Sequence, residues 1–127
     1  VSDNIHFMRD PTRGGVATTL NEITDGLKYG MLLEEEKIPV SKKVSALCEI
    51  LGFDPLYLAN EGKVVLICGQ QDTEKVLSAM RRHPMGRKSV VIGKVIKDYK
   101  GKVVMRTLAD SLRIVDMLSG SQLPRIC

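Results

Sequence analysis

Short apolar runs alternate along this chain with segments in which apolar residues recur every three or four positions. The longest apolar run, residues 64–68, has five residues, whereas a membrane-spanning helix needs roughly 20. Short runs bounded by Gly, Pro, Asn or Asp are typical of strands, and the wider spacing is typical of helices. The alternation therefore predicts a domain in which strands pack against amphipathic helices.

The predicted fold is an α+β domain with about five strands in a single mixed β-sheet packed against helices. The strands are expected at residues 5–8, 31–33, 63–68, 89–96 and 103–105. The continuous apolar character of residues 63–68 predicts burial on both faces. A turn at residues 98–101 predicts that the last two strands pair as a hairpin, with Gly93 as a possible bulge. For residues 108–118, helical spacing and a short strand fit equally well.

Three helices are predicted from apolar spacing and capping residues. The first is expected to be capped by Asp10 or Thr12 and to end at Gly30. The second is expected to start at Ser41 and end at Gly52, and the third to start at Asp72. The predicted buried stripe of the second helix consists of Val44, Leu47, Cys48 and Leu51.

Composition excludes several classes of protein. A chain of 127 residues with 43% hydrophobic residues is long enough for one globular core. The net charge of +4 comes from Lys and Arg spread along the chain, which does not indicate a nucleic-acid module. The three cysteines form no Cys-x-x-Cys pair, so we expect no metal site and no disulfide framework, and a cytoplasmic protein. Because the chain starts at Val1, we expect it to be cut from a longer protein.

Two neighbouring glycines, Gly14 and Gly15, stand at the predicted start of the first helix, just after Arg13. Lacking a Cβ, they allow a ligand or another backbone to approach closely. The first N–H groups of a helix favour anions, so a phosphate is one interpretation. Tight packing of the helix is the other, and the spacing favours it slightly.

Glu61 lies in a predicted turn, Asn60-Glu61-Gly62, just before an apolar strand. A carboxylate held partly out of water can act as a proton acceptor. Most glutamates in turns are simply exposed, and the residue pattern alone favours that interpretation.

The last residue is Cys127, at the end of a segment, residues 119–127, that contains Pro124 and is predicted to be an extended flexible tail. A thiolate is a strong nucleophile, and such a tail can carry it into a pocket at high effective concentration. An accidental cysteine at the end of a fragment is the equally weighted alternative.

Three motifs together resemble the HypE family of carbamoyl dehydratases, which act in [NiFe]-hydrogenase maturation. They are the segment 9–17, the turn 60–62, and the ending Leu123-Pro124-Arg125-Ile126-Cys127. The first motif is shared with the wider superfamily of aminoimidazole-ribonucleotide synthetase. The ending is more specific, and the resemblance covers the whole chain as a C-terminal half, with residues 1–118 as the domain.

The resemblance implies an ATP-dependent reaction on the chain's own thiol. A HypF-like carbamoyltransferase would place a carboxamide on Cys127, and dehydration would turn it into a thiocyanate. The cyano group would then pass to iron on a HypC–HypD complex. Glu61 matches the glutamate implicated in proton removal, and the nucleotide phosphates or the entering tail would lie near Asp10, Thr12, Arg13, Gly14, Gly15 and Asn60.

The family's N-terminal half is absent from this chain. That half would supply most of the site for ATP and Mg²⁺ and the usual homodimer contact, so we predict that this chain alone is inactive. Two alternatives remain open: a superfamily relative acting on a phosphorylated small molecule, and a docking module that is not an enzyme. A redox thiol carrier is weaker still, because no resolving cysteine stands near the tail.

Overall fold

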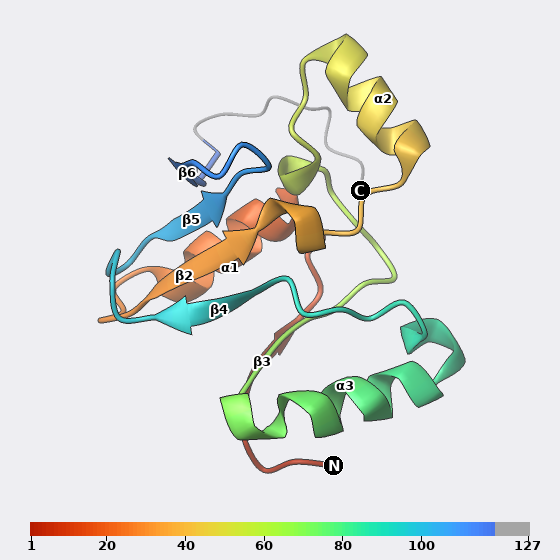
Figure 1. The fold of residues 1–127 in the computed structure, drawn as a ribbon, viewed down its shortest axis with the longest axis vertical. Helices are drawn as coiled ribbons and strands as arrows, with labels where there is room; N and C mark the ends of the chain where they lie inside the picture. The colour runs from red at the N-terminus through yellow and green to blue at the C-terminus, as the bar shows by residue number, and fades with distance from the viewer. Residues whose placement is uncertain (119–127) are drawn as a thin grey trace.

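The structure, a computed structural model, describes residues 1–118 of the chain. Its elements are β1 (Ile5–Arg9), α1 (Gly15–Thr24), β2 (Gly30–Glu34), α2 (Lys42–Leu51), β3 (Val65–Cys68), α3 (Thr73–Arg82), β4 (Gly93–Ile96), β5 (Val103–Arg106) and β6 (Leu112–Ile114). Short 3-10 turns join several of them, including one at Pro55–Tyr57. The predicted α+β class, with a mixed sheet packed on helices, is confirmed (Figure 1). The predicted tail, residues 119–127, lies outside the described residues.

The strands of the described chain form two sheets, so the prediction of a single sheet is wrong. Four strands form a mixed sheet in the order β4-β2-β5-β6, while β1 and β3 form a separate antiparallel pair. All four residues of β3 are only half-buried, which contradicts the predicted burial on both faces. Only Val65 and Ile67 of β3 pack against the main core, because the strand faces the core with one side.

The predicted hairpin between β4 and β5 is also wrong, because β2 lies between them. β2 pairs antiparallel with β4 and parallel with β5. The connection from β4 to β5 crosses the start of β2, where the N–H of Gly101 donates to Tyr29 O at 2.9 Å. A Cβ on Gly30 would lie 2.4 Å from Asp98 O. Gly30 therefore permits this crossing, and it does not end the first helix, which is followed by Asp25.

The main core lies between α1 and one face of the mixed sheet. Met31 and Leu33 of β2 pair in register with Val103 and Met105 of β5. These four side chains share a face, since alternate residues of a strand point the same way. All are buried, and the cluster is completed by Ala17, Leu20, Leu56 and Val115. Burial of this apolar surface is the main stabilising contribution to the fold.

Helix α2 has the predicted caps but not the predicted burial. Ser41 Oγ accepts from the N–H of Val44 at 3.3 Å, and Gly52 closes the helix with a φ of 70°. Of the predicted stripe, only Cys48 is buried; Leu47 is 56% exposed and Leu51 is 52% exposed. Figure 1 shows the reason, since α2 stands apart from the sheet, at the opposite end of the molecule from α3.

Two further local predictions are settled by the sheet. Of the two alternatives for residues 108–118, the strand is correct, because β6 pairs antiparallel with β5. Gly93 is not a bulge, since it pairs with Leu33 in the regular register of β2 and β4. A Cβ at Gly93 would lie 2.3 Å from Leu32 O, so the glycine serves close strand approach.

The start of α3 is stabilised differently from the prediction. Asp72 occupies the N-cap position, but its side chain does not cap the helix. Its carboxylate accepts instead from Ser2 Oγ at 2.7 Å and from Asn4 Nδ2 at 2.8 Å. These bonds hold the pKa of Asp72 below its usual value, the Ser2 bond contributing most. They fasten the first residues of the chain to α3.

Candidate functional site

Helix α1 begins at two glycines that both adopt a left-handed conformation. Gly14 has a φ of 68° and Gly15 a φ of 66°, a region that L side chains rarely adopt. The predicted cap by Asp10 or Thr12 is wrong, because Gly14 is the N-cap and no side chain caps the helix. Thr12 Oγ1 instead donates to Asp10 Oδ2 at 3.3 Å. The first N–H groups of α1 therefore lack a side-chain acceptor, an arrangement that suits an anion.

Gly15 also allows the start of α1 to pack against a loop of the same chain. A Cβ at this position would lie 2.4 Å from Leu56 O and 2.5 Å from Leu58 O. Both oxygens are main-chain atoms of the segment around the turn Pro55–Tyr57, so they cannot move aside as a flexible side chain can. Tight packing, one of the two interpretations of the glycine pair, is thus satisfied at Gly15 by the backbone of this segment.

Gly14 faces a hydroxyl that the sequence analysis did not single out. A Cβ on Gly14 would lie 2.1 Å from Thr18 Oγ1. That hydroxyl is buried and finds no hydrogen-bond partner among residues 1–118. The spacing of four residues, which places Thr18 one helical turn after Gly14, was the available signal. Thr18 is therefore an additional polar group at the glycine helix start.

The structure brings the two predicted motif segments together. The N–H of Asn60 donates to Pro11 O at 3.2 Å, which joins the turn 60–62 to the segment before α1. The Asn60 side chain donates to Leu58 O at 3.0 Å and accepts from Lys63 Nζ at 2.8 Å. Asn60 therefore organises this turn, and Lys63 is a cation at the site that the sequence analysis missed.

Glu61 is exposed, and the residues described give it neither a hydrogen bond nor an ion pair. Among the described residues, Glu61 is therefore an exposed turn residue and not a carboxylate held partly out of water. The next residue, Gly62, adopts a φ of 70° that sets the turn. The carboxylate is therefore available to a ligand or to another part of the protein.

The two arginines near α1 differ in their partners. Arg9 forms an ion pair with Glu22 of α1. Arg13 is exposed, and no carboxylate within residues 1–118 lies in ion-pair distance of it. The positive charge of Arg13 is thus free to attract an anion to the helix start.

The predicted thiol cannot be placed, because Cys127 lies outside the described residues. The other two cysteines are packed in the domain: Cys48 is buried and Cys68 is half-buried. Both therefore contribute to packing as small hydrophobic side chains.

Other features of the surface do not involve the predicted residues. A hollow of about 350 Å³ is lined by Glu34, Glu36, Arg106, Thr107, Leu108 and Asp110. Two of its acidic residues are paired, Glu34 with Lys37 and Asp110 with Arg106. In the part of the chain that is described, no three His, Cys, Asp or Glu side chains gather to hold a metal ion. No helix within residues 1–118 is long and apolar enough to cross a membrane.

Comparison with known protein families identifies the family of this domain. Residues 1–106 match the family model described as AIR synthase related protein, C-terminal domain. The chain belongs to this family. The glycine helix start and the turn 60–62 therefore lie within a C-terminal domain of the AIR synthase type, and β6 and the segment after it lie beyond the matched residues.

Individual relatives are closer still and agree with the resemblance found in the sequence. The chain is 55% identical over 127 residues to the carbamoyl dehydratase HypE of Cupriavidus necator, covering all of this chain and 36% of that protein. A crystal structure of the hydrogenase maturation protein HypE in complex with ATP matches with a TM-score of 0.88 and 43% identity. That match covers 98% of this chain and 38% of the other.

A crystal structure of a HypE–HypF complex also matches, with a TM-score of 0.84 and 42% identity. It covers 91% of this chain and 37% of the matched chain. The chain thus spans little more than a third of the length of the relatives that it matches.

Proposed function

We propose that this chain is the C-terminal domain of an ATP-dependent carbamoyl dehydratase, a lyase that converts a carboxamide on its own terminal thiol, Cys127, into a thiocyanate. The cyano group would supply the cyanide ligands of [NiFe]-hydrogenase iron. The observation that carries this proposal is the 55% identity, over all 127 residues, to a protein named carbamoyl dehydratase HypE. In this proposal, residues 1–118 are the folded domain and residues 119–127 are the tail that delivers the thiol.

The reaction divides into an activation and a proton removal. The amide oxygen of S–C(=O)–NH₂ is a poor leaving group, and bound ATP would supply the phosphoryl group with which that oxygen departs as phosphate. Two protons leave the nitrogen, and S–C≡N remains. Glu61 is the proposed base for proton removal, since its exposed carboxylate has no partner among the residues described.

The glycine helix start supplies groups that fit a phosphate or the entering tail. The N–H groups at Gly14 and Gly15 have no side-chain cap, and Arg13 has no carboxylate partner within residues 1–118. The buried hydroxyl of Thr18 lacks a hydrogen-bond partner in the same part of the chain. Asp10, Thr12 and Asn60 complete the proposed binding region, in which Asn60 keeps the two motif segments together. A solved HypE structure contains ATP, which supports nucleotide binding by the whole protein.

Most of the site for ATP and Mg²⁺ is proposed to lie in an N-terminal half outside this chain. The chain spans 36% of its carbamoyl dehydratase relative, which leaves room for such a half. We therefore expect the isolated chain to bring about neither ATP hydrolysis nor thiocyanate formation.

The proposed partners follow from the same reaction. A HypF-like carbamoyltransferase would load Cys127, and the solved complex of HypE with HypF supports that pairing. A HypC–HypD complex would receive the cyano group, and the full-length protein would be a homodimer. We propose that the reaction takes place in the cytoplasm, where cysteine thiols are kept reduced.

A mass spectrum of the C-terminal peptide tests the proposal. The full-length parent protein is incubated with the carbamoyltransferase and carbamoyl phosphate, and ATP is then added. The expected result is a carboxamide adduct on Cys127 that loses one water when ATP is present, with no adduct in Cys127→Ala. An unmodified Cys127 beside an active transferase contradicts the proposal. It would favour a docking module or an enzyme acting on a phosphorylated small molecule.

A further inference from the structure

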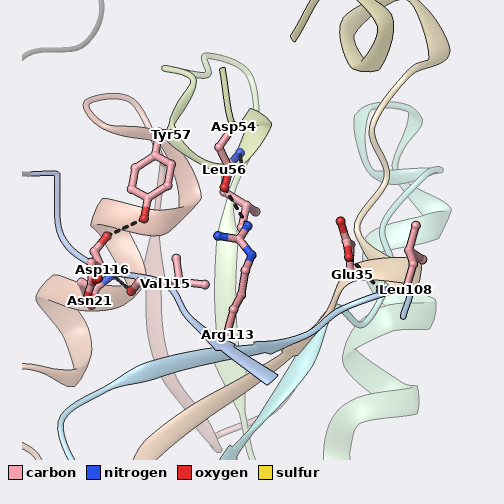
Figure 2. A network of polar contacts seen from close by, with 9 residues as sticks. All are labelled: Asn21, Glu35, Asp54, Leu56, Tyr57, Leu108, Arg113, Val115 and Asp116. Atoms are coloured by element: carbon pink, nitrogen blue, oxygen red, sulfur yellow. Dashed lines mark hydrogen bonds and ion pairs between the residues drawn. The ribbon is translucent and has the colours of Figure 1, made fainter. Parts of the chain in front are cut away.

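The chain immediately after β6 is held by side chains from two other parts of the domain, as Figure 2 shows. Asn21 Nδ2, on α1, donates to Val115 O at 2.8 Å. Tyr57 Oη, on the 3-10 turn Pro55–Tyr57, donates to Asp116 O at 2.7 Å. Both acceptors are main-chain carbonyls, so these bonds fix the path of the backbone independently of the side chains at 115 and 116.

Both donors are themselves held in place, Asn21 by a second hydrogen bond and Tyr57 by packing against the main core. The Asn21 amide also donates to Ala17 O at 2.9 Å, which orients it along α1. Burial raises the pKa of Tyr57, and the nearby Asp54 carboxylate raises it further, so the hydroxyl keeps its proton at neutral pH and can donate. Val115 is fully buried, and its N–H donates to Val103 O at 2.8 Å. The ordered path of the chain therefore continues past the end of β6.

An ion pair joins β6 to the same 3-10 turn. Arg113 Nη2 lies 2.6 Å from Asp54 Oδ2, and Asp54 Oδ1 accepts from the N–H of Leu56 at 2.9 Å. Asp54 thus fastens the strand and the start of the turn at once (Figure 2). The β5–β6 connection is held near its β5 end by Glu35, whose Oε2 accepts from the N–H of Leu108 at 2.8 Å.

The turn that carries Tyr57 is also the turn against which the glycine helix start is packed. The carbonyl oxygens of Leu56 and Leu58 occupy the space where a Cβ of Gly15 would stand. Tyr57 lies between them and binds Asp116 O. One short segment therefore fixes both the start of α1 and the point from which residues 119–127 continue.

We propose that Asn21, Tyr57 and the Asp54–Arg113 pair are positioning residues that hold the root of the Cys127-bearing tail at a fixed place beside the Gly14–Gly15 helix start. This inference rests on the proposed function. The four side chains form the tail anchor.

The anchor matters because dehydration is intramolecular. Cys127 lies eleven residues after Asp116, so the thiol reaches at most about 40 Å from the anchor. Its effective concentration at the site depends on where the tether starts and on its length. Without the bonds to Val115 O and Asp116 O, Val115 stays held by its buried side chain and its N–H bond to Val103 O, but Asp116 and the residues after it lose a set direction. We expect the dehydration rate to fall roughly two- to fivefold.

Loading of the thiol with carboxamide should depend less on the tail anchor than dehydration does. Transfer of the carbamoyl group from a separate enzyme requires the thiol to be exposed, and the position of its root on this domain is secondary. Loss of the anchor should therefore slow dehydration and leave the rate of carboxamide formation unchanged. A general loss of folding lowers both.

The test uses the full-length protein in three forms: unmodified, Tyr57→Phe with Asn21→Ala, and Tyr29→Phe as the matched control. Tyr29 is exposed and removal of its hydroxyl touches none of the anchor bonds. Carboxamide formation is followed with the carbamoyltransferase, and single-turnover conversion to the cyano adduct is then started with ATP. The expected result is unchanged loading and a two- to fivefold slower conversion in the anchor variant alone. Equal conversion rates, or an equal loss in both steps, overturn the proposal.

A second measurement is independent of catalysis. Nitroxide labels are placed on Cys127 and on Ser78→Cys of α3, after other accessible cysteines are replaced by serine. Pulsed EPR should show a broader distance distribution in the single variant Tyr57→Phe, which keeps the aromatic ring and so preserves packing. Identical distributions overturn the anchor. Absence of any cyano adduct in the unmodified protein rejects the proposed function instead, and leaves this distance measurement valid.

Discussion

Gly15 at the start of α1 stands directly against the main-chain oxygen of Leu56, with room for a hydrogen and no room for a methyl group. A Cβ at Gly15 would lie 2.4 Å from that oxygen. The contact joins the glycine helix start to the turn Pro55–Tyr57, which also holds the chain after β6 through Tyr57. The geometry of the candidate site therefore depends on a close backbone approach that only glycine permits.

Gly15→Ala should destabilise the domain by about 3 kcal/mol, because it combines overpacking against backbone with a left-handed conformation that alanine adopts poorly. Urea unfolding of the chain measures the effect. Gly26→Ala is the control, since Gly26 has a similar φ of 71° but nothing within 4 Å of its Cβ position. That variant should lose only about 1 kcal/mol. Equal losses in the two variants would show that the contact with Leu56 contributes nothing.

Glu61→Gln should slow thiocyanate formation by the full-length protein by roughly 10²- to 10⁴-fold, as expected when a general base is removed. Loading of Cys127 with carboxamide should be unchanged, because a separate enzyme catalyses it. The unfolding midpoint should also stay constant, since Glu61 is exposed and without a partner among residues 1–118. Glu49→Gln, at an exposed position on α2, is the matched control. Retention of full dehydration in Glu61→Gln would exclude the glutamate as the base.

Ile50→Ser should change the free energy of unfolding by less than about 0.5 kcal/mol, although isoleucine is usually a core residue. Ile50 is 80% exposed on α2, so little apolar burial is lost. Met105→Ala should cost about 3 kcal/mol, because Met105 is 2% exposed and fills the core between α1 and the sheet. Urea denaturation of both variants makes the comparison. A large loss from Ile50→Ser would mean that α2 packs its apolar face in solution.

The Asp72 carboxylate should make a pH-dependent contribution to stability. Its pKa is held below its usual value in the folded chain, first by the Ser2 hydroxyl and then by the Asn4 amide. A group whose folded pKa is lowered stabilises above its unfolded pKa, about 3.9, and loses that contribution as the pH falls through the folded value. Asp72→Asn should therefore be less stable than the unmodified chain at neutral pH, and the difference should shrink as the pH falls through the lowered pKa of Asp72.

Denaturation curves at several pH values check this prediction for Asp72. Asp3→Asn, at an exposed position nearby, serves as the control. A stability difference between Asp72→Asn and the unmodified chain that stays constant from neutral to strongly acidic pH contradicts the prediction.

Sequence patterns located most of the elements, since strands and helices appear near the predicted residues. Which strands pair with one another was harder to predict from the sequence. Residues 103–105 are apolar and follow a turn, which is typical of a hairpin, yet their strand lies beside β2. A local pattern reports that a segment is extended, but the choice between partners depends on contacts with residues far along the chain. The apolar stripe of α2 misled for a related reason, because spacing shows that a face exists and does not show what covers it.

In the candidate site, too, some features follow from the local sequence and others only from the tertiary structure. The amino-acid sequence by itself determined the glycine pair at the start of α1, the turn at Gly62 and the cap at Ser41, because backbone conformations and caps depend on neighbouring residues. Only the tertiary structure decided that Asn60 binds Pro11, that Gly15 packs on Leu56, and that Asn21 and Tyr57 hold the chain after β6. Those contacts join segments tens of residues apart, and folding forms them only when burial of the common core offsets the entropy of closing the loops between them.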